Sequence, residues 1–304
     1  MGRIVVIGSY NVGLTVVAPS LPAPGQTVLG HTFDMGPGGK GSNQAIGARR
    51  LGADVSLVVK LGADAFAADA RELFAREGLL GAGVLEADTH TGVGLILVDD
   101  GGRNMIAVAP GANGRLVPGD LDGIPGLFAG ASHLLCQLEC PPSLFAAAAR
   151  EARAAGVTTI LNPAPGVPLE DEVLALADIL TPNETELEVL AGAPVRDEQE
   201  AEAGARTLIA SGAGRVVVTL GEHGVLVVGP NGDARHRPAR SVRAVDTTGA
   251  GDAFNAGFAT GLAAGLGLEE ALELGIRAGA FCVTRLGVID GLPTREQLDA
   301  EVPA

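Results

Sequence analysis

Short runs of apolar residues alternate along most of the chain with longer segments in which apolar and polar residues repeat at a helical period. The first run, residues 3–8, is rich in Val and Ile and ends in glycine, which is typical of a buried β-strand. The pattern predicts further strands at 55–60, 132–138, 157–161, 178–181 and 215–220. It predicts helices at 41–51, 63–77, 143–155, 198–210, 249–264 and 268–285, and another after 181. Strands that alternate with helices predict an α/β fold whose mostly parallel central sheet is covered on both faces.

Two stretches, residues 12–35 and 91–108, depart from this alternation. Each contains alternating apolar residues and glycine-containing turns, at 24–25 and 100–102, but no helical repeat. This pattern predicts antiparallel hairpins outside the main sheet, and we expect them to form a small β lid over the edge where the parallel strands end. Because neither a linker nor a long internal repeat divides the chain, we expect residues 1–304 to form a single domain.

Composition narrows the class of protein. Hydrophobic residues make up 47% of the chain but aromatic residues only 3%, so the core must consist mainly of Ala, Val, Leu and Ile. The net charge of −15 and the lack of a basic stripe argue against a nucleic-acid partner. No apolar run reaches the roughly 18 residues of a membrane span. The three cysteines have no C-x-x-C spacing, which favours reduced, buried thiols in a cytoplasmic protein.

A small-residue stretch opens the helix predicted at 249–264. Gly249, Ala250 and Gly251 precede Asp252. The free N–H groups of a first helical turn and its positive dipole end favour an anion, and glycine lets a phosphoryl group approach the backbone. Phosphoryl transfer needs this charge stabilisation and a base for the attacking hydroxyl, a role that fits Asp252. The structural alternative is an ordinary helix start with an acid in its first turn.

A second glycine-rich segment, residues 36–44, places Lys40 and Asn43 at the start of the helix predicted at 41–51, where both can hydrogen-bond ligand hydroxyls. The glycine spacing also matches the G-x-G-x-x-G fingerprint of NAD-dependent oxidoreductases. However, Pro37 lies within the turn, and the preceding strand is not the buried N-terminal one. A Walker A loop does not fit, because Gly41 rather than Ser or Thr follows the lysine. A flexible turn with a solvated lysine is the structural alternative.

Four polar residues follow other predicted strands. Asn183 and Glu186 have the spacing of a capping box, with contact to phosphates or Mg²⁺ as the functional alternative. Glu139 and Asn11 each come at or just beyond the end of a predicted strand, where a ligand of a parallel sheet would bind. A simply solvated side chain is the alternative for both.

Together these segments resemble the ribokinase family of carbohydrate kinases, the PfkB-type group. The matching segments are GSYN (8–11), PGQT (24–27), GGKGSNQA (38–45), GAN (111–113), QLE (137–139), NPAP (162–165), TPNETE (181–186), TLG (219–221) and DTTGAGDAF (246–254). The resemblance implies a three-layer α/β sandwich with a β lid that pairs across a homodimer. It also implies ATP and a sugar as substrates, Mg²⁺, and a monovalent cation such as K⁺.

The resemblance also implies a role for individual residues. Asp252 would be the catalytic base, and the N–H groups of Gly249, Ala250 and Gly251 would form the anion hole. Asn11, Gly39, Lys40, Asn43 and Glu139 would hold the sugar. Asn183 and Glu186 would serve the phosphate and Mg²⁺ region, whereas Thr219, Gly221 and Gly251 would lie along the nucleotide. Asp246, Thr248, Arg285 and Gly287 would surround the monovalent cation.

The chain departs from the family pattern at two positions. Gly13 stands where ribokinases usually carry an aspartate that binds sugar hydroxyls, which removes a charge-assisted hydrogen bond worth about 1.5–3 kcal/mol. Gly291 stands near a usual serine of the cation loop, which bears on K⁺ dependence. The first expectation is phosphorylation of D-ribose to ribose 5-phosphate. The alternatives are a different or bulkier sugar, or a fructokinase, ketodeoxy-sugar kinase or nucleoside kinase. A non-catalytic sugar sensor is an alternative of another class.

Overall fold

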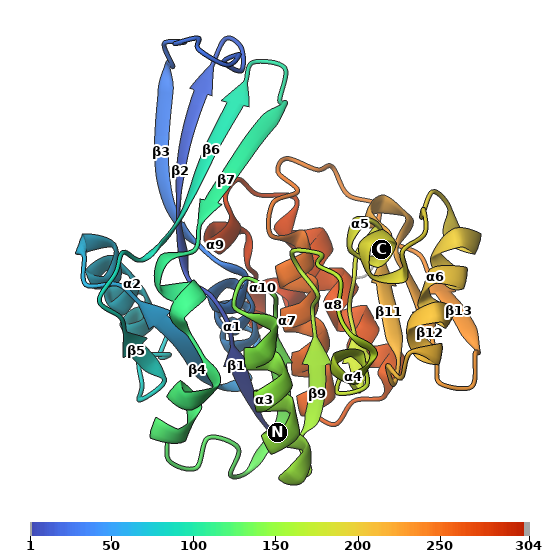
Figure 1. Cartoon of the computed structure of the whole chain (residues 1–304). Helices are drawn as coiled ribbons and strands as arrows, with labels where there is room; N and C mark the ends of the chain where they lie inside the picture. The colour runs from blue at the N-terminus through green and yellow to red at the C-terminus, as the bar shows by residue number, and fades with distance from the viewer. Residues whose placement is uncertain (1, 301–304) are drawn as a thin grey trace.

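The main sheet has nine strands in a computed structural model that describes residues 2–300 (Figure 1). Its spatial order is β13-β12-β11-β10-β9-β8-β1-β4-β5. The strands are β1 (Arg3–Ile7), β4 (Asp54–Leu61), β5 (Val84–Glu86), β8 (Ala131–Cys136), β9 (Thr158–Leu161), β10 (Ile179–Leu180), β11 (Val216–Thr219), β12 (Val225–Val228) and β13 (Ala234–Arg237). All pairings from β5 to β11 are parallel, whereas β12 and β13 add an antiparallel hairpin. The predicted mostly parallel sheet is confirmed.

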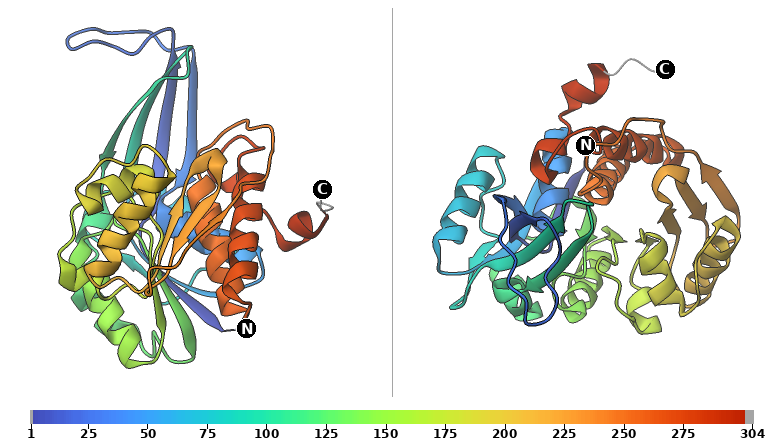
Figure 2. Two further views of the ribbon diagram at one scale, coloured as in Figure 1. Left: turned by 90° about the vertical axis from the view of Figure 1, so that its right-hand side faces the viewer. Right: turned by 90° about the horizontal axis from the view of Figure 1, so that it is seen from above.

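Helices cover both faces of this sheet, as Figure 2 shows. Alternate residues of β1 enter different cores: Ile4 and Val6 join one buried cluster, and Val5 and Ile7 join the other. The first cluster includes residues of α1 (Lys40–Arg50), α2 (Ala65–Arg76), α7 (Ala250–Ala263) and α8 (Leu268–Cys282). The second includes residues of α3 (Pro142–Ala154), α5 (Glu184–Ala191) and α6 (Glu198–Ala210). The three-layer sandwich expected from the sequence is therefore confirmed.

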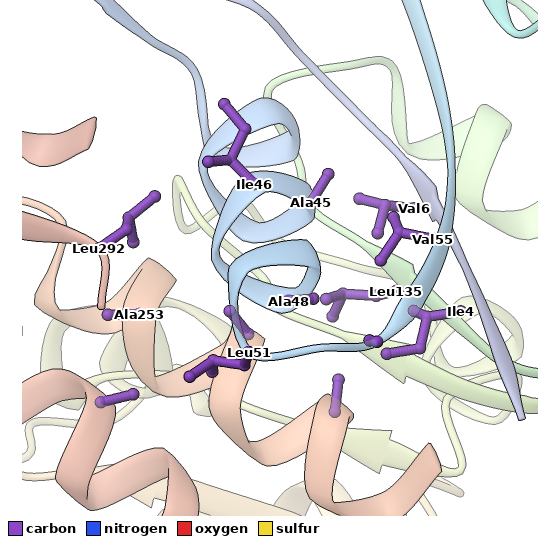
Figure 3. Packing of buried hydrophobic residues seen from close by; sticks show 14 of the residues in the cluster. Ile4, Val6, Ala45, Ile46, Ala48, Leu51, Val55, Leu135, Ala253 and Leu292 are labelled. Carbon is purple, nitrogen blue, oxygen red and sulfur yellow. The ribbon is translucent and has the colours of Figure 1, made fainter. Parts of the chain in front are cut away.

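Small side chains allow α1 to lie close to the sheet and to α7. Ala45 and Ala48 of α1 pack beside Ile4 and Val6, with Ala253 of α7 nearby (Figure 3). A Cβ on Gly47 would lie 2.7 Å from the Cβ of Ala256, so a larger residue would push the two helices apart. This close packing brings a helix from the first third of the chain against a helix from the last third.

Four strands form a second sheet, the lid, which projects from the sandwich (Figure 1). They are β2 (Asn11–Ala18), β3 (Thr32–Gly38), β6 (Gly92–Asp99) and β7 (Asn104–Ala109), in the order β3-β2-β6-β7. The β2–β3 and β6–β7 pairs are antiparallel, but the central β2–β6 pair is parallel. The two predicted antiparallel hairpins are therefore confirmed, whereas the parallel pairing that joins them was not predicted. Val12 belongs to the main core and Leu14 packs against it, which anchors the lid.

The predicted elements differ from the observed ones mainly at their ends and in short pieces. The helix expected to reach 285 ends at Cys282, and the strand expected at 132–138 spans Ala131–Cys136. The elements that the pattern did not predict are β5, β12, β13, α4 (Asp171–Leu174), α9 (Val288–Gly291), α10 (Arg295–Ala300), and the 3-10 helices η1 (Gly111–Arg115), η2 (Pro118–Gly123) and η3 (Gly221–His223). These pieces are too short to show a hydrophobic period. Within residues 2–300, no helix has the length and apolarity that crossing a bilayer requires.

Candidate active site

The N-terminus of α7 opens at the edge where the parallel strands end. Its N-cap, Gly249, has φ 83°, in the left-handed region, and a Cβ there would lie 2.6 Å from Cγ1 of Val288. Only glycine meets both constraints without strain. By contrast, no atom lies within 4 Å of where a Cβ on Gly251 would be. The first-turn N–H groups, which have no partner within the helix, therefore border open space that suits an anion.

Asp252 is buried in the first turn of α7 and is only 6% exposed. Its Oδ2 accepts a hydrogen bond from Nδ2 of Asn43 at 2.8 Å, and its Oδ1 accepts one from Nε2 of Gln44 at 2.9 Å. Two amides of α1 thus fix the orientation of the carboxylate. The structure brings together the two glycine-rich segments that the sequence singled out, but the part played by Gln44 was not predicted.

A chain of buried polar groups continues from Gln44 in both directions. The linked groups, in order, are the side chains of Gln137, Gln44, Asn162, Thr181 (through its carbonyl and its hydroxyl) and Asn255, and the carbonyl of Gly251. The donor–acceptor distances along this order are 2.6, 3.0, 2.9, 2.6 and 2.8 Å. This amide chain connects the ends of β8, β9 and β10 to the first turn of α7. Because the groups hold one another in place, the chain rigidifies the surroundings of Asp252.

The turn before α1 packs against the backbone of Asn11 and leads into Lys40, which lies close enough to Asp252 to feel its charge. Gly39 has φ 93°, and a Cβ on it would lie 2.7 Å from the backbone N of Asn11, so glycine is required there. Oε2 of Glu139 accepts a hydrogen bond from the backbone N–H of Lys40 at 2.8 Å and another from the hydroxyl of Ser9. Glu139 therefore ties the end of β8 to the glycine turn.

Lys40 is surrounded by acidic groups. Burial acts to lower its pKa, but the negative charges of Asp252, Glu139 and Glu186 outweigh burial, and the pKa is raised overall. The ammonium group therefore keeps its charge in the folded protein at neutral pH. The expected structural alternative, a solvated lysine on a flexible turn, does not describe this residue.

Asn183 and Glu186 form the capping box that their spacing predicted. Oδ1 of Asn183 accepts the N–H of Glu186 at 2.8 Å, and Oε2 of Glu186 accepts the N–H of Asn183 at 2.9 Å. Burial raises the pKa of Glu186, and the charge of Asp252 adds to this effect, whereas the N–H of Asn183 and the charge of Lys40 oppose it. The cap is therefore electrostatically linked to the site.

A cavity of about 750 Å³ adjoins the α7 N-terminus, because Ala250 and Gly251 belong to its lining. The residues expected along a nucleotide, Thr219, Gly221 and Gly251, all line it. Of the pair expected in the phosphate and Mg²⁺ region, Asn183 lines the cavity and Glu186 does not. Its wall also includes apolar side chains, among them Val225, Val242, Phe254, Ile276 and Val283. A cavity of this size whose wall combines apolar side chains with polar groups is typical of a ligand site.

Asp246 joins the loop before α7 to the turn before α9. Its Oδ1 accepts the N–H of Thr248 at 2.9 Å, and its Oδ2 accepts the N–H of Gly287 at 3.0 Å. Burial acts to raise its pKa, but these hydrogen bonds prevail and lower it. The guanidinium of Arg285 instead stacks on the Phe281 ring, 3.5 Å from its centroid. Among the described residues, no group of three His, Cys, Asp or Glu side chains is arranged to hold a metal.

The fold and site define an α/β phosphotransferase: a buried acid and a helix N-terminus separate a polar acceptor side from a nucleotide-sized cavity. The chain belongs to the pfkB family of carbohydrate kinases, because the model described as "pfkB family carbohydrate kinase" matches residues 1–295. It is a sugar kinase. The NAD-dependent alternative is wrong, since residues 36–38 belong to the lid strand β3 and not to a parallel strand.

Several known proteins are similar over nearly the whole chain. A ribokinase of Haemophilus influenzae is 39% identical over 293 residues, covering 96% of this chain and 95% of the relative. A deoxyribokinase of Salmonella typhi is 35% identical over 298 residues, covering 97% of each chain. The solved Arabidopsis thaliana ribokinase complexed with ribose and ATP has a TM-score of 0.89, with 30% identity and 98% of each chain covered.

Proposed function

We propose that this chain transfers the γ-phosphoryl group of ATP to a hydroxyl of a sugar, with D-ribose, giving ribose 5-phosphate, as the first acceptor to test. The observation that carries the proposal is the position of Asp252, a buried acid in the first turn of α7, held by Asn43 and Gln44. The bound substrates of the Arabidopsis ribokinase, ribose and ATP, support the choice of both substrates.

Asp252 acts as the general base. As the acceptor hydroxyl attacks the γ-phosphorus, its proton passes to the carboxylate of Asp252. A new phosphorus–oxygen bond forms to the sugar, the bond from the γ-phosphorus to the bridging oxygen breaks, and ADP leaves. Charge on the transferred group is stabilised by the backbone N–H groups of Gly249, Ala250 and Gly251, because they are preorganised at a positive helix end. The N–H of Ala250 also donates to the carbonyl of Thr247 at 3.3 Å, so it would be shared with the phosphoryl group. Lys40 adds a positive charge on the acceptor side.

The sugar lies between the base of the lid and α1. Asn11, Gly39, Lys40, Asn43 and Glu139 surround this space in the proposal. Oδ1 of Asn43 is buried and has no hydrogen-bond partner within residues 2–300. Such an acceptor is costly unless a ligand satisfies it, so a sugar hydroxyl that donates to Asn43 accounts for it. Both hydrogen bonds that Glu139 accepts from protein groups end on its Oε2 and hold the Lys40 turn, so its Oε1 is the atom that would accept from the sugar.

ATP occupies the cavity lined by Thr219, Gly221 and Gly251. The apolar wall suits a flat purine ring, and the phosphates extend toward the first turn of α7. The oxygen atoms of Asn183 and Glu186 fit Mg²⁺, which prefers such donors and keeps several water ligands. When bound, Mg²⁺ would neutralise phosphate charge. Asp246, Thr248, Arg285 and Gly287 are the proposed surroundings of K⁺, with the carboxylate of Asp246 and backbone carbonyls as donors.

The lid is the proposed contact surface of a homodimer. Its exposed apolar side chains include Phe33, Met35, Leu95 and Met105. Through the strand pairings, all four lie on the face of the lid that also carries Leu14. An apolar sheet face of this kind is costly to leave in water and favours association with a second copy.

ADP release with a panel of acceptors tests the proposed activity. D-ribose, 2-deoxy-D-ribose, D-fructose, a ketodeoxy sugar acid and adenosine would each be offered with ATP and Mg²⁺, and the products identified by mass. We expect acceptor-dependent ADP release and a phosphorylated sugar. The absence of both with every acceptor would contradict the proposal and favour a non-catalytic sugar sensor.

A further inference from the structure

Three glycines lie side by side across the lid. Gly13 of β2 pairs with Gly36 of β3 and with Gly94 of β6. Directly paired residues of neighbouring strands direct their side chains to the same face of a sheet. The lid therefore has a strip, three strands wide, that carries no side chain. We call this strip the glycine floor.

Neither the backbone nor the packing requires these glycines. None of the three has a positive φ angle. No atom lies within 4 Å of a Cβ placed on Gly36 or Gly94, and a Cβ on Gly13 would make only ordinary contacts at 3.6 Å. The neighbouring Gly92 differs, because a Cβ there would lie 2.1 Å from Oδ1 of Asn11. Since glycine weakens strands, open glycines without a structural reason mark a place that another group approaches closely.

The glycine floor adjoins the proposed sugar site. Gly13 comes two residues after Asn11 in β2, so the floor lies on the same face of the lid as the Asn11 side chain. Val12 and Leu14 point to the opposite face, toward the core. Asn11 touches the Gly39 turn that carries Lys40. A ligand held at that turn can therefore extend along this face of the lid over the floor.

The borders of the floor are uncharged. Cδ1 of Ile96 would lie 3.6 Å from a Cβ on Gly13, and Val108 of β7 is paired with Gly94. The nearest carboxylate on this face of the lid is Asp34, which comes two residues before Gly36 in β3 and is paired with Thr15. The floor thus offers flat peptide surface and apolar edges, which favour an uncharged, flat group by close contact and offer a charged group no partner to offset its loss of hydration.

We propose that the glycine floor extends the acceptor site and selects a sugar with an uncharged ring or alkyl substituent, such as a β-riboside, over a free pentose. This inference rests on the proposed kinase function, and it specifies the acceptor of that same site. The substituent lies flat on the floor while the hydroxyl that is phosphorylated reaches Asp252.

The inference can be tested with substitutions that add a methyl group to the floor without straining the backbone. Gly94→Ala and Gly13→Ala would be compared with Gly81→Ala, a control whose Cβ also enters open space at a non-positive φ but lies outside the lid. Acceptor binding by calorimetry and kcat/KM by ADP release would be measured for D-ribose, methyl β-D-ribofuranoside and adenosine. We expect wild type to prefer one of the substituted acceptors. Gly94→Ala should lower kcat/KM for that acceptor by roughly tenfold or more, while kcat/KM for D-ribose stays within about twofold of wild type. The control Gly81→Ala should not show this selective loss.

Other results would overturn the inference. A wild type that binds D-ribose more tightly than both substituted acceptors, or alanine variants that affect all acceptors equally, would remove it while leaving the kinase proposal in place. A changed monomer–dimer equilibrium with unchanged acceptor preference would assign the floor to a second copy instead. Selective binding of a substituted acceptor without ADP release would support the floor but contradict the proposed phosphoryl transfer.

Discussion

Both carboxylate oxygens of Asp252 are occupied by amide donors from α1, and the two donors are not equivalent. Asn43 keeps one buried oxygen without a partner in the described part of the chain, so it is suited to meet the ligand. Gln44 is 0% exposed and is bound on every side, to Asp252, Asn162 and Gln137. Gln44 is therefore a positioning residue that acts through Asp252.

Replacing Gln44 by Ala should lower kcat roughly tenfold to hundredfold, because a displaced base loses its alignment with the attacking hydroxyl. KM for the sugar should change much less. The distinguishing measurement is a double-mutant cycle with Asp252→Asn. If Gln44 acts through the carboxylate, its removal should cost almost nothing further in the Asp252→Asn background. Equal losses in both backgrounds would show that Gln44 supports the fold generally.

The sequence patterns identified the residues of the candidate site, but not the residues that hold them in place through hydrogen bonds. Asp252, Lys40 and Asn43 lie in glycine-rich segments. A glycine-rich helix start can be recognised from a few neighbouring residues, so these three could be predicted from the sequence. Gln44 contacts a residue 208 positions away, and the amide chain it belongs to is assembled only when several strand ends meet. No local pattern distinguishes a buried amide of this kind from an exposed one. The burial of polar residues in α1 likewise depends on α7 packing against it.

At the scale of elements, the alternation of apolar runs predicted the layers because each strand and helix buries its own periodic face. It did not predict β12 and β13, since this hairpin interrupts the alternation that indicates parallel strands. The parallel pairing at the centre of the lid was missed for another reason. β2 and β6 are separated by about seventy residues of other elements, and the hydrophobic pattern of a strand does not specify its neighbour.

Asp246 stabilises the contact between the loop before α7 and the turn before α9, and this contribution should depend on pH. Its folded-state pKa lies below the usual value near 3.8, so the stabilisation is present above that value and is lost as the pH falls through the folded pKa. We expect Asp246→Asn to have a lower unfolding midpoint than wild type between pH 5 and 8, by a nearly constant amount. The difference should shrink below about pH 4. Thermal unfolding measured across this range checks the sign, and a difference that grows on acidification would contradict it.

At the scale of the whole molecule, the site draws on distant parts of the chain: α1 and the lid come from residues 11–109, and α7 from the last third. The lid rises beyond the sandwich (Figure 1). Four large exposed apolar side chains, Phe33, Met35, Leu95 and Met105, lie on its Leu14 face, against Ile106 and Val108 on the opposite face. The resemblance alone suggested a dimer, and the exposed face supports that proposal.

A double substitution, Met35→Glu with Met105→Glu, should weaken the proposed dimer. Both side chains are about half exposed and lie on the Leu14 face, so two buried charges would oppose association. We expect the dimer dissociation constant to rise roughly thirtyfold or more, the effect of a loss of about 2 kcal/mol. Asn104→Glu, on the opposite face of β7, is the matched control. Sedimentation equilibrium that shows the same association state for all variants would argue against this interface.

The central claim is that Asp252 removes the proton of the acceptor hydroxyl, and the most direct measurement is the turnover of Asp252→Asn on the best acceptor. The exposed acid Asp122, substituted Asp122→Asn, serves as the control for loss of one negative charge. We predict that kcat of Asp252→Asn falls by about 10²–10⁴ while its unfolding midpoint and sugar affinity stay close to those of wild type. Turnover equal to that of wild type would contradict the account.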